Sequence, residues 1–125
     1  MEPYDDSMPE ILKKNGIYSH LNSDHYHYWE DGGCTYHNRY SSWENVRGQE
    51  GDHWKACVGE KELPLHLGEC VKQDMVNREY ADTVEKMAQT QTFQAGIEFL
   101  DRNHKSDNWF LQVETFDPHG PFNCL

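Results

Sequence analysis

Hydrophobic and polar residues follow a helical pattern and then an extended one at the start of the chain. Residues 5–16 offer Asp6 or Ser7 as a helix cap, a proline in the first turn, and Gly16 after the last turn. These signals predict a helix. Residues 17–23 (IYSHLNS) then alternate with a period of two, which predicts a short strand.

The second half of the chain repeats this order of helix and strand. Residues 74–104 have apolar residues at helical spacing. Positions 76, 80, 84 and 87 form one apolar stripe, and positions 93, 97 and 100 form a second, out of phase. We therefore expect two helices that meet near residues 90–92. Residues 109–115 (WFLQVET) are almost continuously apolar or β-favouring, as in a buried strand of a parallel sheet.

Residues 24–68 show no convincing period and hold several glycines with most of the histidines and tryptophans. So long an irregular stretch is typical of a functional loop or binding surface. The whole pattern predicts an α/β fold, with a sheet flanked by helices. Two predicted strands do not make an independently stable sheet, and the chain stops at residues 124–125 directly after a loop. We therefore interpret it as an incomplete α/β domain.

Composition restricts the classes of partner. The 125 residues fit one domain, and 22 carboxylates against 11 lysines and arginines give a net charge of -11, which disfavours nucleic acid. No apolar run approaches a membrane span, and residues 1–14 lack the apolar core of a signal peptide, so the compartment stays open.

The cysteines form no CxxC pair, and we expect free thiols. They are Cys34, Cys57, Cys70 and Cys124.

Two histidine-bearing segments directly follow the predicted strands. The first is residues 24–29 (DHYHYW), where an extended backbone would point His25 and His27 to the same side. The second is residues 116–122 (FDPHGPF), where prolines on both sides restrict the backbone around His119. Ligands of α/β sheets bind beyond the carboxyl ends of strands. We therefore expect the three imidazoles to face one cleft, with ring distances within about 10 Å, enough to share one anion.

Two stretches resemble segments of the sulfatase family. The stretch DDSMPEILKKNGIYS is similar to the sulfatase segment in which an acidic turn precedes LPExLKxxGYxT and a strand. The stretch AGIEFLDRNHKSDNWFLQVETFDPHGPF is similar to the sulfatase helix, PFFLxxxxxxPHxPF strand and histidine-bearing loop. The resemblance implies that residues 1–125 are a partial catalytic domain of the alkaline phosphatase-like sandwich. The part runs from just after the nucleophile motif through the PHGPF loop.

The resemblance also assigns roles to the histidines. His119 matches the substrate-binding histidine of the family. The family's Lys-aromatic-His element falls on residues 23–29 (SDHYHYW). Without a gap, Asp24 takes the lysine place and Tyr26 the histidine place; with a one-residue insertion, His25 and His27 take them. Since the lysine is absent in either case, His25 and His27 are kept as alternative substrate-binding residues.

The family's reaction needs groups that this sequence does not match. The sulfatase nucleophile is a formylglycine made from the first residue of a Cys/Ser-x-Pro-Ser-Arg motif, and calcium lies beside it. None of the four cysteines is followed by x-Pro-Ser-Arg. The family's Asp-Asp and Asp-His-Gly calcium segments also have no counterpart, because Asp5-Asp6 precedes a helix. We expect no metal ligands here, and calcium and formylglycine only in the complete enzyme.

The predicted function is therefore that of a sulfuric ester hydrolase, acting in the complete enzyme on the sulfate ester of a small molecule or glycan. The chain alone is expected to be inactive. One alternative is a phosphonate or phosphate ester hydrolase of the same superfamily. Another is a non-enzymatic metal-binding or interaction module, with Asp24, His25, His27 and His119 as nitrogen and oxygen ligands. Neither nucleic acid nor a membrane is an expected partner.

Overall fold

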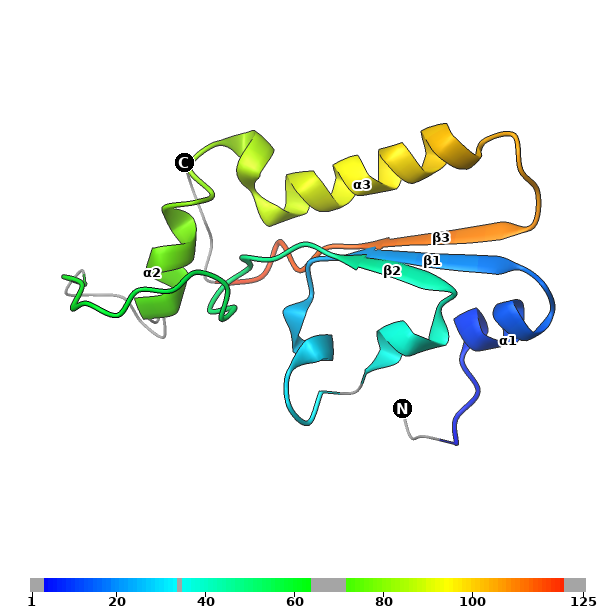
Figure 1. Cartoon of the computed structure of the whole chain (residues 1–125), viewed down its shortest axis with the longest axis horizontal. Helices are drawn as coiled ribbons and strands as arrows, with labels where there is room; N and C mark the ends of the chain where they lie inside the picture. Colours follow the sequence, from blue (N-terminus) through cyan, green and yellow to red (C-terminus); the bar gives the residue numbers. More distant parts are fainter. Residues whose placement is uncertain (1–3, 34, 64–71, 121–125) are drawn as a thin grey trace.

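A computed structural model describes residues 4–33, 35–63 and 72–120, which form a small three-stranded parallel sheet with helices around it (Figure 1). The strands are β1 (Tyr18–Ser23), β2 (Ser42–Asn45) and β3 (Trp109–Glu114), in the order β2-β1-β3. This arrangement confirms the α/β class. The expectation of only two strands was wrong, because the third strand lies in the middle stretch that showed no period.

The register places the carboxyl ends of all three strands at one edge of the sheet. β1 pairs with β3 from Tyr18↔Trp109 to Ser23↔Glu114, and with β2 from His20↔Ser42 to Ser23↔Asn45. Both pairings are parallel. Whatever follows β1, β2 and β3 in the chain therefore gathers at the same edge.

Helices cover both faces of the sheet (Figure 1). The helix α3 (Ala88–Asn103) lies on one face, against β1 and β3. The helix α1 (Met8–Lys14) lies on the other face, together with the short 3-10 helix η2 (Tyr36–Arg39). The remaining elements are η1 (Tyr26–Trp29), α2 (Lys72–Arg78) and η3 (Val84–Lys86). Since β1 is covered on both faces, five of its six residues are buried.

The helix boundaries differ from the expected ones in two places. The first helix, α1, is shorter than the predicted helix of residues 5–16. Gly16 follows its end, as predicted, with a φ of 77°. The two helices expected to meet at residues 90–92 are instead separated at residues 79–87, and α3 runs through residues 90–92. Thr92 Oγ1 donates to the Ala88 carbonyl one turn earlier, inside the helix.

The face of α3 that packs against the sheet consists of small residues and not of the expected apolar stripe. Ala88, Thr92 and Gly96 are buried, whereas the predicted stripe is exposed. A methyl group on Gly96 would lie only 2.8 Å from Val113 Cγ2, so the helix lies too close to β3 for larger side chains. The exposed stripe consists of Phe93, Ile97 and Leu100.

The interior is unusually polar for so small a fold. Leu21 and Val76 are buried apolar residues, but Asn22, Asp24 and Asp52 are buried as deeply. In the described part of the chain, no helix is both long enough and apolar enough to cross a membrane. Cys57 is a free, exposed thiol as predicted, while Cys34, Cys70 and Cys124 lie outside the described residues.

We expect the isolated chain to be partly unfolded or self-associated. Within the described residues β2 and β3 each pair with β1 alone, so each presents an open edge that can pair with another chain. Light scattering after size-exclusion chromatography, with amide hydrogen exchange, measures this. A monomer that melts cooperatively and fully protects the amides of residues 109–115 would contradict the expectation.

Candidate functional site

Two loops meet at the carboxyl ends of β1 and β3. Asp24 follows β1 directly, and its carboxylate Oδ1 accepts a hydrogen bond of 2.7 Å from the Phe116 backbone N–H. The Tyr28 hydroxyl from η1 donates to Glu114 Oε1 at 2.8 Å. These two bonds join segments that are far apart in sequence, and they fix the loop after β3 against η1.

The structure brings the three predicted imidazoles together around one aromatic ring. The Phe116 ring centroid lies 5.1 Å from that of His25, 6.1 Å from that of His27 and 4.5 Å from that of His119. The rings of His25 and His119 are therefore less than about 10 Å apart, a span that one bound anion can bridge. The three histidines form what we call the imidazole cluster.

The backbone of the first histidine segment differs from the expected one. Residues 26–29 form the 3-10 helix η1 instead of an extended segment. His25 and His27 still meet, with their rings 5.2 Å apart and nearly perpendicular. A 3-10 turn does not align residues two apart, so this contact follows from packing on Phe116 rather than from strand alternation.

Two members of the imidazole cluster each have a carboxylate behind the ring. His119 Nδ1 lies 3.1 Å from Glu50 Oε1, and His27 Nδ1 lies 2.6 Å from Glu30 Oε2. His119 Nδ1 also lies 2.6 Å from the Gly120 carbonyl. Since the partners of Nδ1 among the described residues are all acceptors, Nδ1 carries the proton in both rings, and Nε2 is the atom left for a ligand.

His25 differs from its two neighbours in its electrostatics. Burial lowers the pKa of the His25 imidazole below its ordinary value, and the nearby Glu114 opposes this only in part. A lowered pKa keeps this ring neutral at neutral pH. His25 can therefore accept or relay a proton, whereas His27 and His119 each have a carboxylate oxygen beside Nδ1.

The geometry gives little support to the gap-free alignment of the Lys-aromatic-His element, in which Asp24 and Tyr26 take the places of the lysine and the histidine. Asp24 would stand at the lysine place, but it is fully buried and carries no positive charge. Burial raises the pKa of the Asp24 carboxyl to about 6. Tyr26, at the histidine place, has its pKa raised to about 12, mainly by burial, so it remains a neutral hydroxyl.

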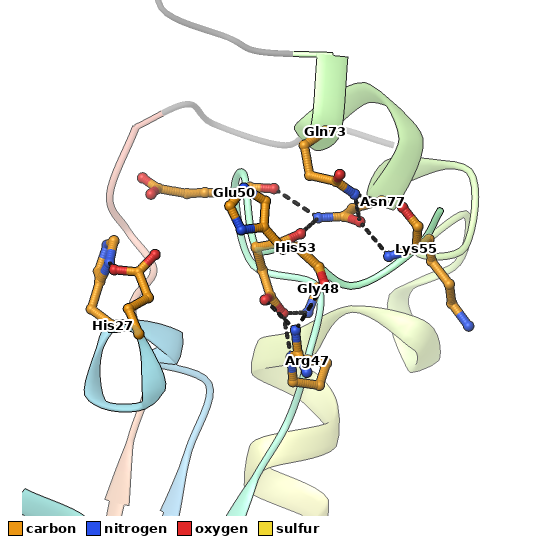
Figure 2. A network of polar contacts seen from close by, with 10 residues as sticks. His27, Arg47, Gly48, Glu50, His53, Lys55, Gln73 and Asn77 are labelled. Atoms are coloured by element: carbon orange, nitrogen blue, oxygen red, sulfur yellow. Dashed lines mark hydrogen bonds and ion pairs between the residues drawn. The ribbon is translucent and has the colours of Figure 1, made fainter. Parts of the chain in front are cut away.

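A buried polar network holds the loop that carries Glu50 (Figure 2). Asp52 Oδ2 and Oδ1 accept bonds of 2.7 and 2.6 Å from Arg47 Nε and Nη2, and Oδ2 also accepts one from the Gly48 N–H. Asn77 Nδ2, from α2, donates to the carbonyls of Glu50 and Asp52 at 3.1 and 2.7 Å. Asn77 and Asp52 are both 1% exposed. We call this set the Asn77–Asp52 network.

Sequence reasoning missed Glu50 and the network that holds it. The segment of residues 47–52 (RGQEGD) needs unusual backbone conformations, with φ of 109° at Gly48 and 47° at Glu50. A side chain at Gly48 would come within 2.7 Å of the Trp54 ring. Closely spaced glycines around an acidic residue were the signal for a structured turn.

The described residues do not fit the calcium ion and formylglycine that the family resemblance implies. Within residues 4–33, 35–63 and 72–120, no group of three His, Cys, Asp or Glu side chains is arranged to hold a metal ion. Cys57 is followed by Val-Gly and not by the x-Pro-Ser-Arg sequence.

Comparisons of the chain with protein-family models, with curated proteins and with solved structures found no match. The sulfatase resemblance therefore depends on the two motifs, and the chemistry of the site depends on the imidazole cluster. That cluster offers one neutral imidazole and two carboxylate-backed imidazoles at a sheet edge, an arrangement suited to an oxyanion.

Proposed function

We propose that the chain is part of a sulfatase catalytic domain, in which the imidazole cluster binds the sulfate group of a sulfate ester. The supporting observation is the gathering of His25, His27 and His119 around Phe116 at the carboxyl ends of β1 and β3. In the complete enzyme, segments other than the described residues would supply the formylglycine nucleophile and the calcium ion.

The chain's own residues would bind the anion and handle a proton. With Nδ1 directed at Glu30 or Glu50, a protonated His27 or His119 presents Nε2–H to a sulfate oxygen. A proton at one of these Nε2 atoms can also be donated to the bridging ester oxygen of a bound sulfate ester. Neutral His25 is the ring suited to accept a proton.

Local charge favours a sulfate ester over a phosphate monoester. The cluster is surrounded by the carboxylates of Glu30, Glu50 and Glu114, and the whole chain carries a net charge of -11. A sulfate monoester has a single negative charge, whereas a phosphate monoester has about -1.5 to -2 near neutral pH. The carboxylates repel a phosphate monoester more strongly than a sulfate monoester, which supports a sulfate ester as the ligand.

We expect the purified chain to bind an aryl sulfate through the imidazole cluster without turning it over. Titration with phenyl sulfate, followed by NMR of the histidine rings, should shift His27 and His119. His119→Ala should weaken binding about tenfold, the loss expected for one hydrogen bond to a charged group. His104→Ala is the matched control, because His104 is exposed at the end of α3.

Two outcomes would count against this proposal. Binding that is unchanged in His119→Ala would remove the imidazole cluster as the anion site. Turnover of an activated aryl sulfate in the presence of calcium, surviving repurification, would show that the chain does not need the missing groups. A Cys/Ser-x-Pro-Ser-Arg motif encoded in the adjoining genomic DNA would independently support the family.

A further inference from the structure

A pocket of about 400 Å³ lies between α3 and the sheet, away from the imidazole cluster (Figure 1). Its lining includes Tyr18 and Trp109, the first residues of β1 and β3, whereas the imidazole cluster follows the last residues of these strands. The volume is within the range of roughly 300–1,000 Å³ that small-molecule sites have. We propose that this pocket is a second reactive site, in which Ser42 is an activated nucleophile that cleaves a small uncharged carboxylic ester. The inference goes beyond the proposed function, because it involves neither sulfate nor the imidazole cluster.

A chain of polar contacts joins the Ser42 hydroxyl to a carboxylate through a buried imidazole, and both Ser42 and the imidazole line the pocket. Ser42 Oγ lies 2.5 Å from His20 Nδ1. On the other side of the ring, Nε2 lies 2.9 Å from Asn22 Oδ1 and 3.5 Å from Glu44 Oε1. His20 is 6% exposed and stacks on the Phe99 ring, with the centroids 4.9 Å apart and 9° between the planes. This packing fixes the imidazole with one nitrogen toward the serine and the other toward two oxygens.

The partners of His20 decide which of its nitrogens carries the proton. Asn22 Oδ1 and the Glu44 carboxylate are acceptors, so Nε2 carries the proton and Nδ1 accepts from the Ser42 hydroxyl. The Tyr18 hydroxyl donates to Ser42 Oγ at 2.9 Å, which leaves the Ser42 proton for His20. A serine that donates to an imidazole, with a third group holding the other nitrogen, is the arrangement of an activated nucleophile.

These contacts supply the proton transfers of ester cleavage. Ser42 Oγ attacks the carbonyl carbon while its proton moves to His20 Nδ1, and this proton passes to the alcohol oxygen as the ester C–O bond breaks. Water then attacks the acyl-serine and gives a proton to His20 Nδ1. The bond from the acyl carbon to Oγ breaks, the carboxylic acid leaves, and the proton returns to Oγ. The Tyr18 hydroxyl, 2.9 Å from Oγ, is a donor close to the carbonyl oxygen on which negative charge develops.

The walls of the pocket favour an uncharged ester with an apolar part. The rings of Phe99 and Trp109 line it, 5.5 Å apart and nearly perpendicular, and they supply apolar surface. Three carboxylates and one guanidinium also line the pocket, and they belong to Glu44, Glu98, Asp107 and Arg102. The excess of negative charge repels an anionic ester. The pocket therefore differs in ligand class from the imidazole cluster, to which we assign an anion.

An uncharged alkyl fluorophosphonate tests the nucleophile on the full chain, because an activated serine displaces fluoride from its phosphorus. We expect mass spectrometry to find one phosphonyl group per chain, on Ser42. Ser42→Ala should abolish the labelling, and His20→Gln should slow it at least about 100-fold, the usual contribution of a general base. Ser106→Ala is the matched control and should be labelled at the rate of the parent chain, because Ser106 is an exposed serine that lines the same pocket.

The ester class is tested by the release of p-nitrophenol from two esters. We expect p-nitrophenyl acetate, which is uncharged, to release it from the parent chain, and Ser42→Ala to lose this release. The anionic mono-p-nitrophenyl ester of succinic acid should react at least about tenfold more slowly, because the carboxylates of the pocket repel it. Equal rates for the two esters would overturn the assigned substrate class.

Four results of the labelling would overturn the reactive site. They are no labelling, labelling only at residues other than Ser42, labelling of Ser42 that is equally fast in concentrated urea, and a folded His20→Gln variant that reacts at the parent rate. Circular dichroism checks the fold of His20→Gln. If that variant unfolds, the parent chain decides, because labelling of Ser42 that urea abolishes requires the folded pocket. Aryl sulfate binding is not measured in these experiments, so the proposed function is tested separately.

Discussion

Replacing Asn77 by alanine is expected to lower the free energy of unfolding by about 3–5 kcal/mol, because it leaves several buried polar groups without partners. Asn77 Nδ2 donates to the carbonyls of Glu50 and Asp52, and Oδ1 accepts from Gln73 Nε2 at 3.0 Å and from the Lys55 N–H at 3.4 Å. Alanine makes none of these bonds, and the site is too enclosed for water to replace them all.

Urea denaturation of the variant and the parent chain measures this loss. Asn38→Ala is the matched control, since Asn38 is exposed in η2 and its replacement should change stability by less than about 0.5 kcal/mol. A change for Asn77→Ala as small as that of the control would mean that the Asn77–Asp52 network does not hold the loop. Glu50 would then have no fixed place beside His119.

The strands beside the imidazole cluster could be predicted because their patterns are simple. Residues 109–115 are continuously apolar or β-favouring, and residues 17–23 alternate; the structure has β3 and β1 there. Strand β2 could not be predicted, because Ser42–Asn45 is only four residues long and reads SWEN. Pairing with β1 makes it a strand, and that is a tertiary effect that local propensity does not contain.

The positions of the histidines followed from topology, but their electrostatic partners did not. Parallel strands with carboxyl ends at one edge bring His25 and His119 together. Glu50 is 69 residues before His119, and a contact over such a separation has no periodic signal. The wrong face of α3 was expected to pack against the sheet for a related reason. The packed face is set by the close approach of Gly96 to Val113, which depends on the distance between the helix and the sheet.

A buried carboxylate beside the imidazole cluster makes stability depend on pH. Asp24 is fully buried, and its Oδ2 has no partner among the described residues. Burial is the main cause that raises its pKa from 3.8 to about 6; Asp117 and Glu114 add repulsion, while the bond from the Phe116 N–H opposes the shift. The folded state therefore binds a proton more tightly than the unfolded state does.

We expect stability to decrease as pH rises from about 4 to about 6, by up to about 3 kcal/mol for this group, since each pKa unit corresponds to about 1.4 kcal/mol. Below the unfolded pKa both states are protonated, and above the folded pKa the cost of burying the charge is fully present. Asp24→Asn keeps an oxygen to accept from the Phe116 N–H but cannot ionise. It should therefore remove this contribution to the slope of the unfolding free energy against pH, and be the more stable chain at pH 7.

Urea denaturation at several pH values tests this, with the exposed Asp31→Asn as control. If Asp24→Asn retains the full slope between pH 4 and 6, the buried charge of Asp24 is not its source.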